Sequence, residues 1–242
     1  MYNNISLLNL LLIDIETVPQ VSEYNSLTAE WQQLFFDKAS KNLPDNPDGE
    51  IPYKQKAGIL AEFGKVICIS TGFYYEDAGG RLCFKLKSIC CKEETDLLKE
   101  FISLVDRFVQ RHPNFQFAGH NIREFDIPFI CRRLIINQIP LPKYFQIQGA
   151  KPWEINMLDT MQWWKFGDYK NYTTLHLLAN VLGIPTSKTD MDGSMVQEVY
   201  YKHEDLPKIV EYCQRDVVVV AQVILRFKNI PLLDPQKIIV AD

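Results

Sequence analysis

Residues 7–17 read LLNLLLIDIET, an apolar run that leads into two acids one residue apart. A short continuous apolar run is typical of a strand buried on both faces, so we expect a strand over residues 7–14 that ends at Asp14. Side chains two residues apart on a strand project to the same side. Asp14 and Glu16 are therefore predicted to converge, and their like charges would need a cation, a proton or a basic partner between them.

The two acids have two interpretations when they are taken alone. Carboxylate oxygens are the ligands that hard ions such as Mg²⁺ and Mn²⁺ prefer, so Asp14 and Glu16 could hold a metal ion. Acidic residues that follow a strand also serve as helix caps or as solvated loop residues. Motifs elsewhere in the chain have to decide between these interpretations.

Length and composition are those of a globular domain. The chain has 242 residues, of which 47% are hydrophobic, enough for a full core, so we expect one domain over 1–242. No apolar run approaches the roughly 18 residues that span a membrane, and the N-terminal run lacks the features of a signal peptide, which predicts a cytoplasmic protein. The net charge of −4 argues against nonspecific coating of nucleic acid, but not against a nuclease whose carboxylates bind metal ions.

The cysteines form no zinc-finger or disulfide pattern. They include no CxxC pair, and no histidines stand at zinc-finger spacing. Each lies among apolar or strand-like neighbours, so we expect reduced thiols that pack as small buried hydrophobic side chains. The six are Cys68, Cys83, Cys90, Cys91, Cys131 and Cys213.

Strands and helices are both predicted after the first strand. Apolar runs between turn signals predict strands at 65–75, 81–90, 115–119 and 154–160, the first two forming a hairpin. Apolar residues at three- and four-residue spacing predict helices at 94–111, 128–137, 173–182 and 205–228. For the last segment this spacing favours a helix in spite of its four consecutive valines. The pattern predicts an α/β fold with a mixed sheet flanked by helices.

Residues 20–62 differ from the rest of the chain. Three prolines punctuate a polar stretch that contains one aromatic cluster, at Trp31, Phe35 and Phe36. We interpret this segment as an insertion after the first strand, a lid or arm and not a second core.

A second motif follows the strand predicted at 115–119. Residues 119–126 read GHNIREFD, in which Gly119 is expected to allow a sharp turn and Asn121 can fix a loop by hydrogen bonds. Asp126 precedes a predicted helix. It is either a helix cap, which is stabilising in itself, or part of the acidic site.

A third motif, YCQRD at residues 212–216, lies within the last predicted helix. Tyr212 and Asp216 are four residues apart, so both point to the same side. Asp216 stands directly before an apolar run, where a charged residue needs a partner or a metal. The alternative is a flank position in which it pairs with Arg215 or a lysine.

Taken together, the three motifs resemble those of the DEDDy group of 3′–5′ exonucleases. Asp-x-Glu on the first strand, Asn-x-x-x-Phe-Asp in the middle and Tyr-x-x-x-Asp on a late helix have the same order and separation. The chain is most similar to the proofreading exonuclease domain of family-B DNA polymerases, over about residues 8–228. Segments 63–74, 151–161 and 190–196 also resemble free-standing bacterial predicted 3′–5′ exonucleases. The resemblance implies an RNase H-like fold with a mixed five-stranded sheet flanked by helices.

The resemblance also implies a reaction. It is the hydrolysis of phosphodiester bonds at the 3′ end of DNA or RNA, single-stranded in the simplest case, with release of nucleoside 5′-monophosphates. Asp14, Glu16 and Asp216 would hold one Mg²⁺ or Mn²⁺ ion, and Asp14, with help from Asp126 through water, would hold a second. Two ions about 4 Å apart stabilise the attacking and leaving oxygens. Tyr212 would orient the attacking water.

Further residues are candidates for contacts with the nucleic acid. Thr17 would contact the terminal nucleotide through its backbone, and Asn121 and Phe125 would shape the pocket. Arg132 and Arg133 could contact phosphates, or they could belong to an ordinary solvated helix face. Protein partners are not indicated by the sequence.

Two other functions stay open on the sequence alone. One is an RNase H-like module that binds nucleic acid without catalysis, although all four carboxylates and the tyrosine of the motifs are present. The other is an endonuclease or oligonucleotide hydrolase, which would differ in how the 3′ end is enclosed. The segment 20–62 could supply such an enclosure, and the choice between DNA and RNA depends on contacts near the 2′ position.

Overall fold

The apolar run near the N-terminus forms strand β1 (Leu10–Pro19), an inner strand of the sheet. The computed structural model describes residues 5–39, 49–151, 154–168, 170–186 and 191–241. The prediction that this strand ends at Asp14 is wrong. Its antiparallel pairing with β2 (Gly64–Glu76) continues to Pro19, so both acids lie inside the strand.

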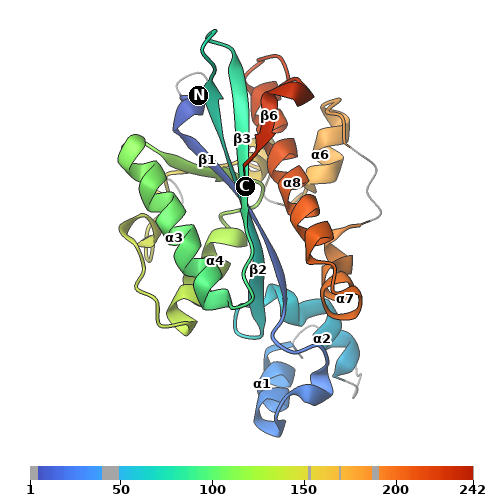
Figure 1. Cartoon of the computed structure of the whole chain (residues 1–242). Coiled ribbons are helices and arrows are strands. Elements are labelled where there is room, and N and C mark those ends of the chain that lie inside the picture. The colour runs from blue at the N-terminus through green and yellow to red at the C-terminus, as the bar shows by residue number, and fades with distance from the viewer. Residues whose placement is uncertain (1–4, 40–48, 152–153, 169, 187–190, 242) are drawn as a thin grey trace.

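The described residues form one mixed sheet in the order β5-β4-β1-β2-β3-β6 (Figure 1). The predicted hairpin is confirmed, because β2 pairs antiparallel with β3 (Leu82–Ile89). Strands β4 (Gln116–Gly119) and β5 (Met157–Asp159) add parallel neighbours on the other side of β1. The predicted α/β fold is confirmed, but the sheet has six strands and not five. The sixth, β6 (Ile238–Val240), pairs with β3 and is too short to give a pattern in the sequence.

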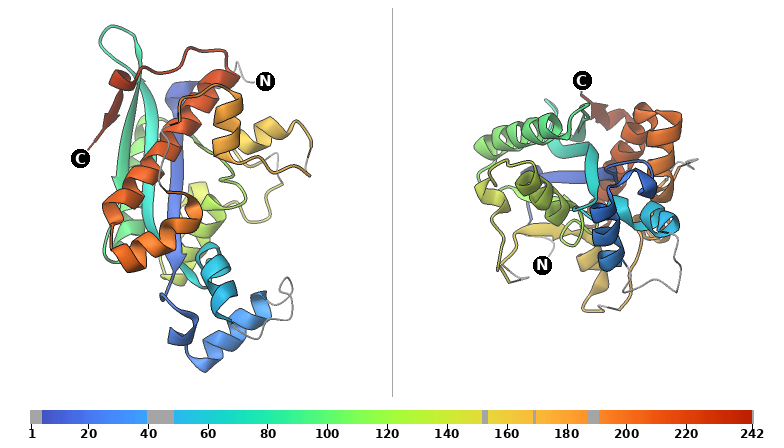
Figure 2. Two further views of the ribbon diagram at one scale, coloured as in Figure 1. Left: turned by 90° about the vertical axis from the view of Figure 1, so that its right-hand side faces the viewer. Right: turned by 90° about the horizontal axis from the view of Figure 1, so that it is seen from below.

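Helices cover both faces of this sheet (Figures 1 and 2). The predicted long helices are confirmed as α3 (Glu94–Arg111) and α8 (Leu206–Phe227), and the predicted short ones as α4 (Asp126–Ile136) and α6 (Leu175–Val181). Outside residues 20–62, two short helices of the described chain were not expected, α5 (Thr160–Lys165) and α7 (Val196–Glu198). None of the described helices is long and apolar enough to cross a membrane.

Alternate residues of β1 face different helical layers. Leu11 and Ile13 pack in one core cluster with residues of α3 and α4. Leu10 and Leu12 pack in another cluster with residues of α8. All four are at most 1% exposed, as expected for a strand that is covered on both faces. This alternation decides which layer the acids further along β1 will face.

The segment between β1 and β2 contains helices α1 (Ala29–Ala39) and α2 (Glu50–Lys56). It lies at the end of these two strands, away from the main helical layers (Figure 1). Phe35, Tyr53 and Phe63 form part of a small apolar cluster of its own. The arm therefore has a local core, which the sequence interpretation did not foresee.

Candidate active site

The alternation along β1 sets the direction of Asp14 and Glu16. Because Leu10 and Leu12 face α8, the next two side chains of even number project to the same layer. The pairing register with β2 shifts only after Glu16, so the alternation holds up to that residue. The Glu16 side chain is buried, with 8% of the residue exposed, whereas Asp14 is partly exposed. The structure thus brings the two carboxylates together, as their spacing predicts.

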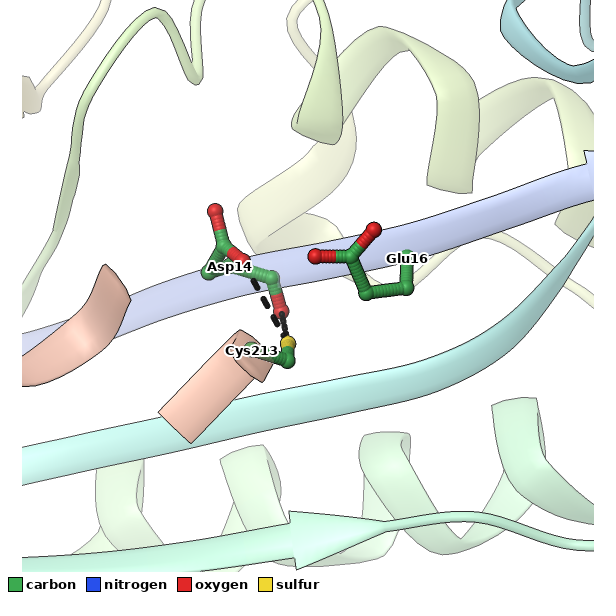
Figure 3. Close-up of side chains that lie close together, drawn as sticks. All are labelled: Asp14, Glu16 and Cys213. Atoms are coloured by element: carbon green, nitrogen blue, oxygen red, sulfur yellow. Dashed lines mark hydrogen bonds between the residues drawn. The ribbon is translucent and has the colours of Figure 1, made fainter. Parts of the chain in front are cut away.

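Helix α8 brings three side chains to the same place. The Tyr212 hydroxyl donates a hydrogen bond to the carboxylate of Asp216, one turn further along the helix. The Cys213 thiol donates to the main-chain oxygen of Asp14 at 3.4 Å and to its Oδ2 at 3.3 Å (Figure 3). One ligand atom each from Asp14, Glu16 and Cys213 lie within 4.8 Å of one another. A carboxylate of β1 and a thiol of α8 are therefore in direct contact.

Asp126 reaches the site from the start of α4 and is 3% exposed. The pairing of β1 with β4 covers Leu10 to Leu12. Further along β1, the N–H of Ile15 donates to Oδ1 of Asp126 at 3.1 Å. The carboxylate therefore links α4 to β1, which is more than the role of a helix cap.

Burial raises the pKa of all four motif carboxylates, and repulsion from neighbouring acids adds to this for Asp14, Glu16 and Asp126. Desolvation is the largest cause in each case. The pKa values of Asp14 and Glu16 lie well above the ordinary range, with repulsion from the other acids of the site as a further cause. The pKa of Asp126 is raised to about 7 and that of Asp216 to about 6. The site therefore favours protons, or cations in their place.

The donor set fits a divalent metal ion. Within the part of the chain that the structure describes, none of the four carboxylates forms an ion pair with lysine or arginine, and no hydrogen bond reaches the carboxylate of Glu16. Arg215, one of the alternative partners considered for Asp216, forms its ion pair with Glu211 and acts on Asp216 through its charge, which lowers the pKa of Asp216. A buried carboxylate without a partner is costly, and oxygen ligands of this kind suit Mg²⁺ or Mn²⁺. Asp126 and Asp216 lie outside the closest group and act on it through their charge.

The loop of the second motif is held by a buried acid, Asp159. Its carboxylate accepts hydrogen bonds from the backbone N–H groups of Asn121 at 3.0 Å and Arg123 at 3.1 Å. Asn121 has a left-handed backbone with φ of 64°, which asparagine tolerates better than most residues. Its Oδ1 is buried and has no hydrogen-bond partner among the described residues. This loop therefore holds a buried acceptor without a donor among the described residues.

The other predicted contact residues are close to this loop or to β1. Phe125 is partly buried and its ring packs against Phe129. Thr17 is partly buried and follows the register shift in β1. Gly119 is needed for a close approach and not for a turn. A Cβ atom there would lie 2.1 Å from a side-chain carbon of Ile122 and 2.9 Å from the backbone oxygen of Ile13.

Sequence reasoning missed two residues of the site. Cys213 was expected to be a passive buried thiol, but its position three residues before Asp216 on a helix already puts both on one side. His176, on α6, lies near enough to lower the pKa of Asp216, and no motif pointed to it. The expectation that all thiols are buried is also wrong, since Cys90 is exposed.

A hollow of about 630 Å³ adjoins the α8 side of the site. Tyr212 and Asp216 line it together with His176 and Gln214 and with apolar residues of α6, α8 and β6. It does not include Asp14, Glu16 or Asp126 among its described lining residues. The hollow is thus a space next to the carboxylates and not the acidic cluster itself.

Comparison with known proteins assigns the chain to a family. Residues 60–232 match the family described as a predicted 3′–5′ exonuclease related to the exonuclease domain of PolB. The chain belongs to this family. The matched segment contains Asp126, Tyr212 and Asp216, whereas Asp14 and Glu16 precede it, so the fold is what unites the first motif with the others. No curated protein matches the chain.

The fold of this exonuclease-related chain is similar to that of a family B DNA polymerase from the hyperthermophilic archaeon Pyrobaculum calidifontis. The TM-score is 0.50 at 15% sequence identity, and the match covers 90% of this chain and 24% of the polymerase. At this identity the likeness concerns the fold alone. The resemblance to the exonuclease domain of family-B polymerases, predicted from the three motifs, is confirmed by the family and the fold.

Proposed function

We propose that this protein is a metal-dependent 3′–5′ exonuclease that hydrolyses the terminal phosphodiester bond of DNA or RNA and releases nucleoside 5′-monophosphates. One observation carries the proposal: four carboxylates from β1, α4 and α8 converge next to Tyr212, and none of them forms an ion pair with a described lysine or arginine. Like charges held together in this way must be neutralised by protons or cations. Membership in an exonuclease-related family favours metal cations over protons as the neutralising species.

The residues that would hold the ions follow from the motifs. Asp14, Glu16 and Asp216 would hold one Mg²⁺ or Mn²⁺ ion, and Asp14 together with Asp126 a second. When bound, such ions lower the pKa of an attacking water and stabilise the departing 3′ oxygen. The chain contributes donors on a strand and two helices, elements that hold side chains more rigidly than loops do.

Tyr212 would orient the attacking water. Desolvation, followed by the charges of Asp216, Glu16 and Asp14, raises its pKa well above the ordinary value of about 10. The phenol is therefore protonated at neutral pH. Its proton is donated to Asp216, and its oxygen is left to accept a hydrogen bond from a water. Tyr212 thus acts as a positioning group and not as a base.

The substrate we propose is the 3′ end of a single strand. Thr17, Asn121 and Phe125 would contact its last nucleotides, and the free Oδ1 of Asn121 offers an acceptor for a sugar or base group. A cytoplasmic location, and one domain over 1–242 with 20–62 as an insertion, are further parts of this proposal. No protein partner is assigned.

A gel time course tests the proposal. Single-stranded DNA and RNA of equal length, labelled at the 5′ end, are incubated with the protein and Mg²⁺ or Mn²⁺, beside Asp216→Asn and the exposed-site control Glu100→Gln. We expect a ladder that shortens stepwise from the 3′ end, mononucleotide products, and loss of cleavage in EDTA and in Asp216→Asn. Internal cuts would indicate an endonuclease, and intact substrate in every lane would indicate a noncatalytic binding module.

A further inference from the structure

Cys213 has no part in the proposed hydrolysis, yet it lies at the centre of the site. The residue is 0% exposed, and its thiol hydrogen-bonds to the carboxylate of Asp14. A sulfur ligand adds nothing for Mg²⁺, because that ion prefers oxygen. A thiol beside two carboxylates is instead a ligand set for ions of softer character.

We propose that Asp14, Glu16 and Cys213 form a second kind of metal site, which binds Zn²⁺ or Cd²⁺ through the thiolate of Cys213. This thiolate site, as we call it, shares two carboxylates with the proposed active site. Its binding chemistry stands on the geometry alone. Only its predicted effect on catalysis rests on the proposed function.

The distances in the thiolate site suit a tetrahedral ion. With a metal–sulfur bond of about 2.3 Å and metal–oxygen bonds of about 2.1 Å, sulfur and oxygen ligands lie about 3.6 Å apart. The sulfur of Cys213 lies 3.3 Å from Oδ2 of Asp14, and the ligand atoms of all three residues lie within 4.8 Å of one another. Rotation of the Glu16 side chain can supply the small remaining movement.

Glu16 gives the second, independent observation. Its residue is 8% exposed, and within the described parts of the chain its carboxylate accepts no hydrogen bond and forms no ion pair. Figure 3 shows this carboxylate on the same side of β1 as Asp14, near the thiol of Cys213. Burial of a carboxylate without a partner is costly. A cation bound between Glu16, Asp14 and Cys213 would supply the missing partner.

The chemistry of binding separates the two kinds of ion. A soft ion displaces the thiol proton of Cys213 to solvent and takes three anionic ligands, with a water at the fourth position. With Mg²⁺ the thiol keeps its proton and remains a donor to Asp14. Because Zn²⁺ would hold Asp14 and Glu16 in a tetrahedral set, we expect it to inhibit the Mg²⁺-dependent reaction.

A cadmium titration followed by ultraviolet absorption tests the thiolate site. A cadmium–thiolate bond gives a charge-transfer band that carboxylates cannot give. The titration uses the full chain with Cys90→Ser and Cys91→Ser, because these adjacent thiols are at least partly exposed and could bind cadmium themselves. We expect one Cd²⁺ per chain with the band, loss of the band in Cys213→Ser, and its retention in Cys68→Ser. Cys68 is the matched control, a buried thiol that hydrogen-bonds to Cys213.

Other results would overturn the proposal. They are a band that survives in Cys213→Ser, a band that is lost in Cys68→Ser alone, or no band in a folded protein. Should Cys213→Ser fail to fold, Asp14→Asn and Glu16→Gln keep the thiol and should each weaken cadmium binding at least about tenfold, since even outer partners of metal ligands cost that much. Unchanged affinity in both would refute the site.

The test distinguishes this site from the proposed function. A cadmium–thiolate band in a protein that cleaves no nucleic acid would leave the thiolate site standing and refute the exonuclease. Mg²⁺-dependent cleavage without any such band, and without inhibition by Zn²⁺, would do the reverse.

Discussion

The ion pair between Glu94 and Arg133 and the acidic site both withdraw carboxylates from water, and they are built in opposite ways. Glu94, at the start of α3, forms an ion pair of 2.6 Å with Arg133 of α4, and their side chains are 10% and 6% exposed. Glu94 also accepts hydrogen bonds from the N–H of Val66 at 2.8 Å and from Asn137 at 2.9 Å. Arg133 donates in addition to the backbone oxygen of Ala61. The charges of this pair are fully satisfied.

The acidic site has the opposite character. Asp14, Glu16, Asp126 and Asp216 repel one another, and the pKa of each is raised. Burial of charge therefore does not by itself mark a functional site. A buried acid with a complete set of partners holds the fold together, whereas a buried acid without them is available to a ligand.

The largest effect on stability should come from breaking the satisfied pair. Arg133→Met leaves Glu94 buried without its cation, so we expect a loss of about 3–5 kcal/mol in the free energy of unfolding. Urea unfolding measures this loss. Arg132→Met is the matched control, because Arg132 is exposed on the same helix and should change stability by less than about 0.5 kcal/mol. Equal losses of stability in Arg133→Met and Arg132→Met would show that the pair with Glu94 does not stabilise the fold, and would contradict the contrast with the acidic site.

Divalent metal should stabilise the acidic site and not the pair. At a concentration of 100 times its dissociation constant, Mn²⁺ should add about 2.7 kcal/mol to the stability of the wild type, measured as a rise of the melting temperature. The same rise should occur in the Glu94→Gln protein, measured from its own lower melting temperature, because its acidic site is intact. It should be absent in Glu16→Gln. A rise that persists in Glu16→Gln would place the metal elsewhere.

The sign of the pH dependence follows from the pKa of Asp126, which is raised to about 7 from an ordinary value of about 3.9. Between these values the folded protein binds more protons than the unfolded chain, so the metal-free protein loses stability as the pH rises from 4 to 7. Asp126→Asn removes the charge and keeps an acceptor for Ile15.

We therefore expect metal-free Asp126→Asn to be more stable than the wild type at pH 8 by about 1–3 kcal/mol, and the difference to shrink at pH 4. Thermal unfolding in EDTA at the two pH values measures it. A variant less stable than the wild type at pH 8 would mean that the carboxylate is satisfied by a partner, as Glu94 is.

The smallest effect should come from Tyr212. Because it positions a water and binds no metal, Tyr212→Phe should slow hydrolysis by roughly tenfold, or about 1.4 kcal/mol, far less than the loss of a carboxylate. Single-turnover rates give this number. A Tyr212→Phe protein as inactive as Asp216→Asn would show that the hydroxyl does more than orient.

Much of the fold could be predicted because local patterns encode it. The spacing of apolar residues gave α3 and α8 within one residue at each end, and the valines 217–220 did not mislead because packing against the sheet decides their conformation. Strand β6 could not be found, since its three residues are a strand only through pairing with β3. Helix α5 could have been found, because its cap Asp159 accepts from Met161 as a typical N-cap does.

The site was predictable as motifs but not as an arrangement. The two-residue spacing of Asp14 and Glu16 puts both on one side of the strand. The four-residue spacing of Tyr212 and Asp216 puts both on one side of the helix. Which helix covers that side depends on the sheet order, which no local pattern contains. For the same reason both interpretations of Arg133 from the sequence, a phosphate contact and a solvated helix face, are wrong, since Arg133 is 5% exposed and paired with Glu94.

The most direct test of the acidic site is a calorimetric titration with Mn²⁺ of the wild type and of Asp14→Asn, with cleavage of single-stranded DNA measured on the same preparations. Asp14 is common to both proposed ions, so we predict that its amide variant, folded by circular dichroism, binds Mn²⁺ at least about tenfold more weakly and does not cleave. Binding as tight as in the wild type, or cleavage at the wild-type rate, would contradict the assignment of these carboxylates as the catalytic metal site.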